Sequence, residues 1–187
     1  MRLRAVFDCM VFLQGAGQPA GPARACFRLV DEERVTLCLS AEILTEVRDV
    51  LTRPKTRCKF PLLSSEWVET FVHNVESKAV VLAAVPQVFT LERDPQDEPY
   101  LNLAFATGAS YPVSRDKDLL ELRNDDNCRQ RYPDLTILDP VAFLQAFARQ
   151  GKPEPATGAG PEQLQEGAAG QGPGSATAEE KAEGGGG

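Results

Sequence analysis

Residues 3–8 read LRAVFD, a short apolar run that ends at an aspartate. An apolar run without polar alternation is typical of a strand that is buried on both faces, as in a parallel sheet. Asp8 would then lie at the carboxyl end of that strand, where open α/β sheets bind their ligands. We therefore expect the functional site at this edge. We expect Asp8 to belong to it, because a buried carboxylate without a partner would be energetically costly.

Strand-like and helix-like patterns alternate along the rest of the chain. The further strands are expected at residues 35–39, 80–85, 111–114 and 135–138. Helices are expected at 22–30, at 41–51, after Ser64 or Ser65, at 99–107 and at 140–150. Strands that alternate with helices predict an α/β fold, a three-layer α/β/α sandwich around a central parallel sheet of about five strands.

Composition divides the chain into two parts. Residues 1–150 contain enough apolar material for one globular domain. Residues 151–187 hold 11 of the 15 glycines and are otherwise rich in Pro, Ala and Glu. Such a segment cannot bury enough apolar surface to offset the entropy of ordering it, so we expect a disordered tail.

Charge and cysteine content exclude several classes of protein. The net charge of −7 gives no general affinity for phosphate backbones, which requires basic side chains. The five cysteines form no Cys-x-x-Cys pair and there is one histidine, so neither a disulfide framework nor a zinc site is expected. The first residues lack a signal-peptide core, and no stretch is long enough to span a membrane. We expect a cytoplasmic protein with reduced thiols and no membrane contact.

Three further acids are expected at the same edge of the sheet as Asp8. Glu46 lies at the border of the apolar stripe of helix 41–51, Asp97 precedes Pro99, and Asp116 follows the strand at 111–114. Each also has an ordinary explanation. Glu46 fits a border residue whose head stays in water, and the two aspartates fit helix caps.

Four carboxylates that converge would repel one another, and a divalent cation relieves that repulsion. Oxygen ligands favour Mg²⁺ or Mn²⁺ over zinc. The chemistry that fits is phosphodiester hydrolysis, in which metal ions hold the phosphate oxygens and activate a water. A haloacid-dehalogenase-like phosphatase is disfavoured because its Asp-x-Asp motif would need an acid at Met10, and no P-loop or dinucleotide-binding motif is present.

Four segments together resemble the PIN-domain nucleases, in particular toxin components related to the VapC ribonucleases. They are residues 6–8, 39–55, 93–104 and 113–120. The resemblance implies a sheet with strand order 3-2-1-4-5 and an endoribonuclease that uses Mg²⁺ or Mn²⁺. It also implies an antitoxin protein as partner and a homodimer. The family's acidic quartet falls on Asp8, Glu46, Asp97 and Asp116, with Asp118 as an accessory acid.

The chain departs from the family pattern beside these acids. Cys9 and Met10 stand where the family usually has Thr and Asn, which removes two polar side chains from the site. Arg115 replaces a glycine and could bind the scissile phosphate or compete with metal. Ser114 replaces a threonine and keeps a hydroxyl.

The substrate contacts and the activity therefore have alternatives. Arg53 and Lys55, with Arg57 and Lys59, form a basic cluster that could guide RNA or could be a solvated loop. The first hypothesis is a metal-dependent endoribonuclease. The second is a PIN module that binds RNA or protein but cleaves weakly, and the third is a metal hydrolase of another substrate class on the same fold.

Overall fold

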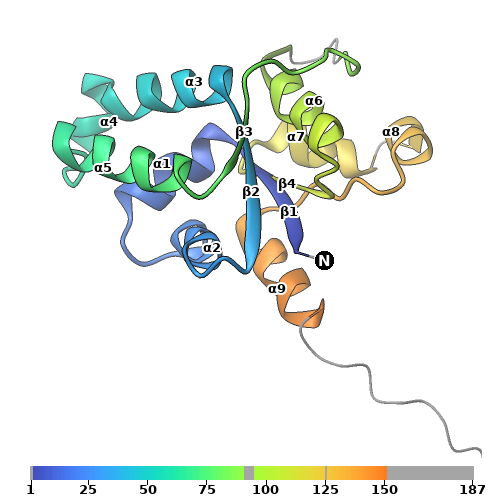
Figure 1. Cartoon of the computed structure of the whole chain (residues 1–187), viewed down its shortest axis with the longest axis horizontal. Coiled ribbons are helices and arrows are strands. Elements are labelled where there is room, and N and C mark those ends of the chain that lie inside the picture. Colours follow the sequence, from blue (N-terminus) through green and yellow to red (C-terminus); the bar gives the residue numbers. More distant parts are fainter. Residues whose placement is uncertain (1, 91–94, 125, 151–187) are drawn as a thin grey trace, which may run out of the picture. The chain divides into compact units, whose positions relative to one another are not determined.

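A parallel sheet lies at the centre of the chain (Figure 1). The computed structural model describes residues 2–90, 95–124 and 126–150, and the tail expected over 151–187 lies outside them. In the described residues the strand order is β3 (Val80–Leu82), β2 (Val35–Ser40), β1 (Leu3–Phe7), β4 (Tyr111–Val113), and every pair is parallel. Strand β1 has a partner on each side, which explains why its last three residues are apolar and almost fully buried.

Helices cover both faces of the sheet, so the predicted α/β fold is confirmed. They are α1 (Cys9–Gly17), α2 (Pro22–Asp31), α3 (Ala41–Thr52), α4 (Pro54–Lys59), α5 (Ser65–Glu76), α6 (Glu98–Thr107), α7 (Lys117–Glu121), α8 (Asp126–Arg131) and α9 (Pro140–Gln150). Short 3₁₀ turns precede α6 at Pro95–Asp97 and follow α7 at Leu122–Asn124. Helix α6 packs on one face of the sheet, and α2 and α9 pack on the other (Figure 1).

An aromatic cluster joins β1 to the helices on the α2 side. The Phe7 ring lies 5.3 Å from that of Phe27 on α2 and 5.9 Å from that of Phe143 on α9, measured between ring centroids. Phe27 also contacts Phe12 on α1 and Phe71 on α5. Edge-to-face pairs of this kind contribute beyond their buried area. They therefore anchor the helices to the strand that leads to Asp8.

The fifth strand predicted at 135–138 is reduced to a single bridge, between Val113 and Leu138. Leu138 donates to the carbonyl of Pro112, and the Ser114 amide donates to the carbonyl of Leu138. The next bond of a parallel ladder would need an amide hydrogen on residue 112, and proline has none. Pro112 thus limits the pairing, although the segment still lies beside β4, in the place expected of strand five.

The sequence patterns did not predict α1, α4 or α8. Helix α1 contains two glycines, and none of the described α4 residues is buried, so neither presents an ordinary amphipathic stripe. Helix boundaries with cap residues were easier to predict. Ser40 and Ser64 cap α3 and α5 through their side chains, and Gly108 ends α6 with φ +63°.

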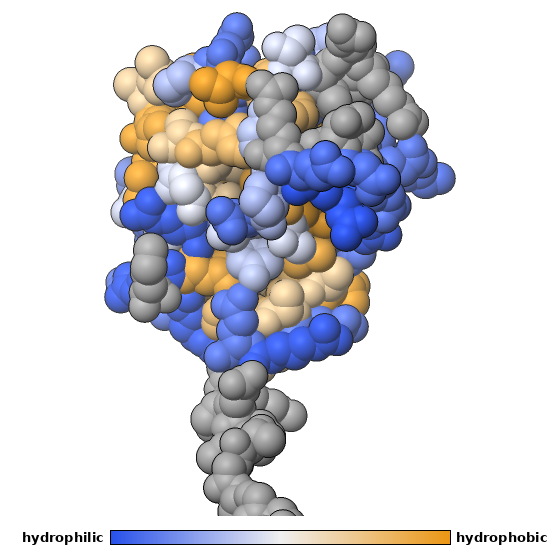
Figure 2. Space-filling model, turned by 90° about the vertical axis from the view of Figure 1, so that its right-hand side faces the viewer, coloured by the Kyte–Doolittle hydropathy of each residue, from blue (hydrophilic) through white to orange (hydrophobic). Residues whose placement is uncertain are grey.

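The surface over α6 to α8 mixes apolar and hydrophilic side chains, as Figure 2 shows. Among the described residues, no helix combines the length and the apolar character that crossing a membrane requires.

Gly15 is expected to be intolerant of a side chain. A Cβ there would come within 2.4 Å of the Phe27 ring, which other aromatic rings hold in place. A glycine-to-alanine change inside a helix otherwise stabilises it by about 1 kcal/mol, but overpacking costs about 1–3 kcal/mol. We expect Gly15→Ala to lower the free energy of unfolding in urea titrations.

Gly21→Ala is the matched control, because a Cβ there meets only the Gln18 side chain at 3.7 Å. Equal stability of the two variants would contradict tight packing at Gly15.

Candidate active site

Asp8 is buried at the junction of β1, β4 and α1, with only 4% of its surface exposed. Its Oδ1 accepts a hydrogen bond from the Val11 amide at 2.7 Å, which caps α1. Its Oδ2 accepts from the Ser114 hydroxyl and from the Arg115 amide, the latter at 3.0 Å. The carboxylate therefore ties the exit of β1 to the exit of β4.

Burial raises the pKa of Asp8 above its ordinary value, chiefly because the charged form loses its hydration. The hydrogen bonds from Ser114, Val11 and Arg115 oppose this shift, and the charge of Asp116 adds to it. Asp8 and Asp116 thus lie close enough to repel each other. A cation placed between them would favour the charged form of both.

Asp116 is joined to Asp8 through Ser114. The Asp116 amide donates to the Ser114 oxygen at 2.8 Å, and the Ser114 hydroxyl in turn donates to Asp8. Asp116 also caps α7, since its Oδ1 accepts from the amides of Asp118 at 2.7 Å and Leu119 at 3.3 Å. The cap expected from the sequence is present, and it leaves the Oδ2 atom of Asp116 without a bond to the described residues.

Glu46 is held by a tyrosine that sequence analysis did not single out. The Tyr100 hydroxyl donates to Glu46 Oε2 at 2.6 Å and accepts from the Cys9 amide at 3.2 Å. Tyr100 is 3% exposed, and burial raises its pKa, so the hydroxyl remains a donor. The only signal for it in the sequence was a tyrosine three residues after Asp97, in the first turn of a helix.

Cys9 lies between Glu46 and Asp8 without acting as an ion. Burial, followed by the charge of Glu46, raises the pKa of its thiol to about 12. Nucleophilic attack and metal binding by cysteine both use the thiolate. The Cys9 thiol is therefore uncharged near pH 7 and lines the site without acting as a nucleophile or a metal ligand.

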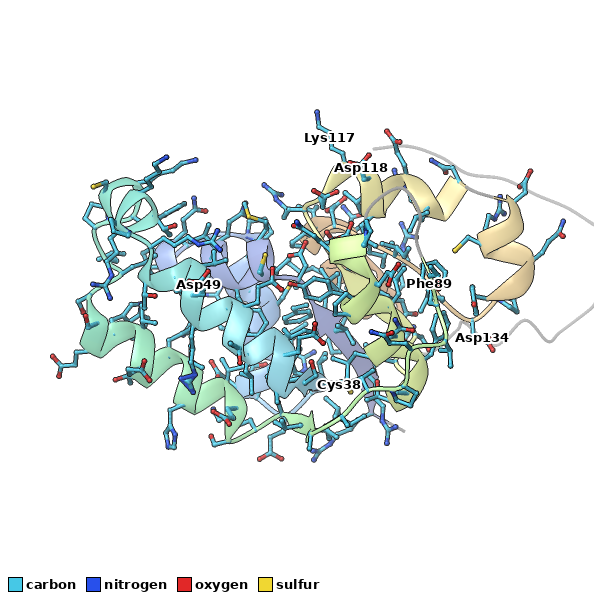
Figure 3. The ribbon with its side chains drawn as sticks, turned by 90° about the horizontal axis from the view of Figure 1, so that it is seen from above. Cys38, Asp49, Phe89, Lys117, Asp118 and Asp134 are labelled. Atoms are coloured by element: carbon cyan, nitrogen blue, oxygen red, sulfur yellow. The ribbon has the colours of Figure 1, made fainter. Side chains whose placement is uncertain are left out.

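The other predicted acids and Arg115 lie at the start of α6 and around the start of α7. Asp97 is 8% exposed and begins α6 without capping it through its side chain. Asp118 is half-buried, and in Figure 3 it lies with Lys117 at the outer side of α7. The Arg115 side chain is exposed, and it forms no ion pair with any residue that the structure describes.

The donor set fits a hard divalent cation by its chemistry, since it consists of carboxylate oxygens. Asp116 uses one carboxylate oxygen to cap α7, whereas Glu46 accepts from the Tyr100 hydroxyl and also forms a side-chain hydrogen bond with the Cys9 thiol. In the described part of the chain, however, no three Asp, Glu, Cys or His side chains converge closely enough to hold one ion. Asp8, Asp116 and Glu46 are thus separate groups, each with its own hydrogen bonds.

The chain belongs to the PIN domain family, because the family model matches residues 4–118, more than half of the chain. PIN domains are generally nucleases that use divalent metals, so the fold is that of a nuclease with nucleic acid as its substrate. The chain is also similar to the uncharacterized protein MJ1680 of Methanocaldococcus jannaschii. The two are 25% identical over 150 residues, which cover 80% of this chain and 94% of that protein.

The raised pKa of Asp8 predicts a pH dependence of stability in metal-free protein. The folded state binds the Asp8 proton more tightly than the unfolded state does, so its contribution is present below pH 3.8 and is lost as pH rises through the folded pKa. We expect the free energy of unfolding of wild type, relative to Asp8→Asn, to fall as pH rises from 3.8. Urea titrations with a chelator measure it, and a difference that stays constant or grows would contradict a raised pKa.

Tyr100→Phe should destabilise the protein by about 1–3 kcal/mol, because it leaves the part-buried Cys9 amide and one Glu46 oxygen without their partner. Tyr111→Phe is the control, since its hydroxyl bonds the exposed Gln150 side chain. We expect the midpoint of thermal unfolding to fall for Tyr100→Phe alone. Equal midpoints would show that the Tyr100 bridge contributes nothing.

Proposed function

We propose that the protein is an endoribonuclease that hydrolyses RNA phosphodiester bonds with Mg²⁺ or Mn²⁺. The observation that carries this proposal is the pair Asp8 and Asp116, linked through Ser114 at the carboxyl edge of the sheet. The metal ligands would be Asp8, Glu46, Asp97 and Asp116, with Asp118 as an accessory acid. The bound ion supplies a Lewis acid for the phosphate and a water of lowered pKa.

The chain's own groups would position these acids. Ser114 and the Arg115 amide orient Asp8, and Tyr100 orients Glu46. Such outer partners matter because losing one costs metal sites about 10–100-fold in affinity or activity. The Tyr100 hydroxyl gives Glu46 a stronger polar partner than the Cys9 thiol beside it.

Four residues are candidate contacts of the RNA. Arg115 is the first, because its exposed guanidinium follows Ser114 directly and can hold a phosphate in two hydrogen bonds. Ser114, the second candidate, is fully buried and its hydroxyl donates to Asp8, so it would act on the RNA only through that acid. Lys55 and Arg53 lie beyond the Glu46 helix, where Arg53 is paired with Asp49.

The proposal also includes a toxin role, an antitoxin partner that blocks the acids, a homodimer and a cytoplasmic location. The first three rest on the sequence resemblance to VapC relatives, and the location rests on the expectation of reduced thiols.

A second candidate is a PIN module that binds RNA or protein and cleaves weakly. It is favoured by one observation: no three ligating side chains converge within the described residues. Asp8 also accepts hydrogen bonds from protein groups at both oxygens, so a metal would compete with them.

Cleavage of a structured RNA separates the two candidates. With Mn²⁺ or Mg²⁺, we expect wild type to cleave, and Asp8→Asn and Asp116→Asn to lose more than about 100-fold in rate, since even outer partners of a metal cost 10–100-fold. Glu32→Gln is the matched control, an exposed acid between α2 and the amino end of β2, and it should cleave normally.

Equal cleavage by Asp8→Asn would refute the metal-site assignment. Tight RNA or partner binding by wild type without metal-dependent cleavage would instead favour the weakened module.

A further inference from the structure

The basic cluster at 53–59 is divided by the structure into two pairs of side chains. Arg53 pairs with Asp49, and Arg57 donates to the Ser65 hydroxyl of α5 at 3.0 Å. Lys55 and Lys59 instead line a groove of about 500 Å³ between α1 and α4. Among the described residues neither lysine has a carboxylate partner. Two cations therefore face one groove with their charges uncompensated.

The groove also has an aromatic wall. Phe60 follows α4 directly and is half-buried, and its ring packs on α1 where Gly17 leaves room. A Cβ on Gly17 would come within 2.7 Å of the ring. The Lys59 ammonium lies 5.8 Å from the centre of the same ring. Phe60 is thus a ring held in place beside a cation, a combination that suits a nucleobase and its phosphate.

The α1 side of the groove leads towards the acids. Met10, Gln14 and Gln18 line it from successive turns of one face of the helix. Met10 is 40% exposed and lies in the first turn of α1, which Asp8 caps. The eight residue steps from Met10 to Gln18 span about 12 Å at a rise of about 1.5 Å per step. The groove therefore begins beside the site and runs away from it.

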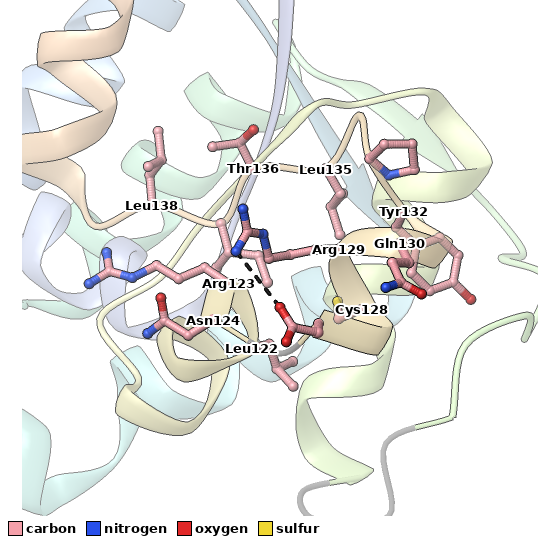
Figure 4. A pocket seen from close by; sticks show the side chains of 13 residues that line it. Leu122, Arg123, Asn124, Cys128, Arg129, Gln130, Tyr132, Leu135, Thr136 and Leu138 are labelled. Atoms are coloured by element: carbon pink, nitrogen blue, oxygen red, sulfur yellow. Dashed lines mark ion pairs between the residues drawn. The ribbon is translucent and has the colours of Figure 1, made fainter.

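The larger pocket around α8 is a weaker candidate (Figure 4). It measures about 760 Å³ and contains Arg123 and Arg129. Arg129 lies 3.9 Å from Asp126, which lines the same pocket, so part of its charge is neutralised. No acid lines the α1–α4 groove.

We propose that the α1–α4 groove binds a single-stranded segment of RNA next to the scissile phosphate, with phosphates on Lys55 and Lys59 and a base against Phe60. This inference rests on the proposed function for the direction in which the RNA continues. The groove itself is defined by charge, aromatic character and shape. A single strand suits it because only unstacked bases can lie against a side-chain ring.

The test is the salt dependence of binding to a fluorescent single-stranded RNA, measured by anisotropy with a chelator present. Removing two phosphate contacts should flatten the slope of log affinity against log salt by about 1.4, at about 0.7 for each contact. We expect this for Lys55→Ala with Lys59→Ala. Phe60→Leu should weaken binding about tenfold and leave the slope unchanged, since stacking carries no ionic contribution.

Arg2→Ala with Arg28→Ala is the matched control. It removes the same charge from two exposed arginines, one just before β1 and one in the last turn of α2, which leads into the amino end of β2. It should keep the wild-type slope. Thermal unfolding of each variant checks that it is folded.

Equal slopes for the lysine variant and wild type would overturn the proposal, as would equal flattening by the control or equal affinity for duplex RNA. Because no metal is present, the result does not depend on cleavage. Failure of the groove is thereby distinguished from failure of the endoribonuclease proposal.

Discussion

The arrangement of the site depends on one buried carboxylate, that of Asp8. Its oxygens accept from the Val11 amide, the Ser114 hydroxyl and the Arg115 amide, and so connect the ends of two adjacent parallel strands to the first helix. A charge with 4% exposure is tolerated only with such partners. The same burial raises its pKa, and nearby Asp116 raises it further. The metal-free fold therefore favours the protonated form of Asp8, whereas a bound cation would favour its charged form.

The second connection is the Tyr100 hydroxyl, which lies between α1, α3 and α6. It joins Glu46 to the backbone of Cys9, where the sequence led us to expect a site short of polar groups. Tyr100 thus brings a hydroxyl from α6 to a site where Cys9 offers only a thiol. Asp8 and Glu46 are held by side-chain and backbone donors, and the neutral Cys9 thiol lies close enough to both to be affected by their charges.

Elements that local interactions form could be predicted from the sequence, whereas elements that depend on contacts with distant segments could not. Strands β1 and β2 and helices α3 and α5 were foreseen because apolar runs and apolar stripes are local signals. Helices α1 and α4 were missed since their helical pattern carries no ordinary apolar stripe. The fifth strand was predicted at 135–138, but that segment forms only one bridge with β4. Pro112 in β4 has no amide hydrogen to donate to it, and the sequence of 135–138 alone does not show this.

The sequence by itself determined the parallel α/β fold and the PIN family, and it placed Asp8 and Asp116 at the carboxyl edge, because the strand ends of such a sheet share one side. Tertiary structure alone decided which groups hold those acids. Ser114 lies 106 residues from Asp8, and Tyr100 lies 54 from Glu46. The tertiary structure also places Lys55 and Lys59 in the α1–α4 groove, whereas Arg53 pairs with Asp49 and Arg57 bonds Ser65. This division arises because alternate residues of a short helix face different partners. Contacts between distant segments depend on packing, which no local pattern contains.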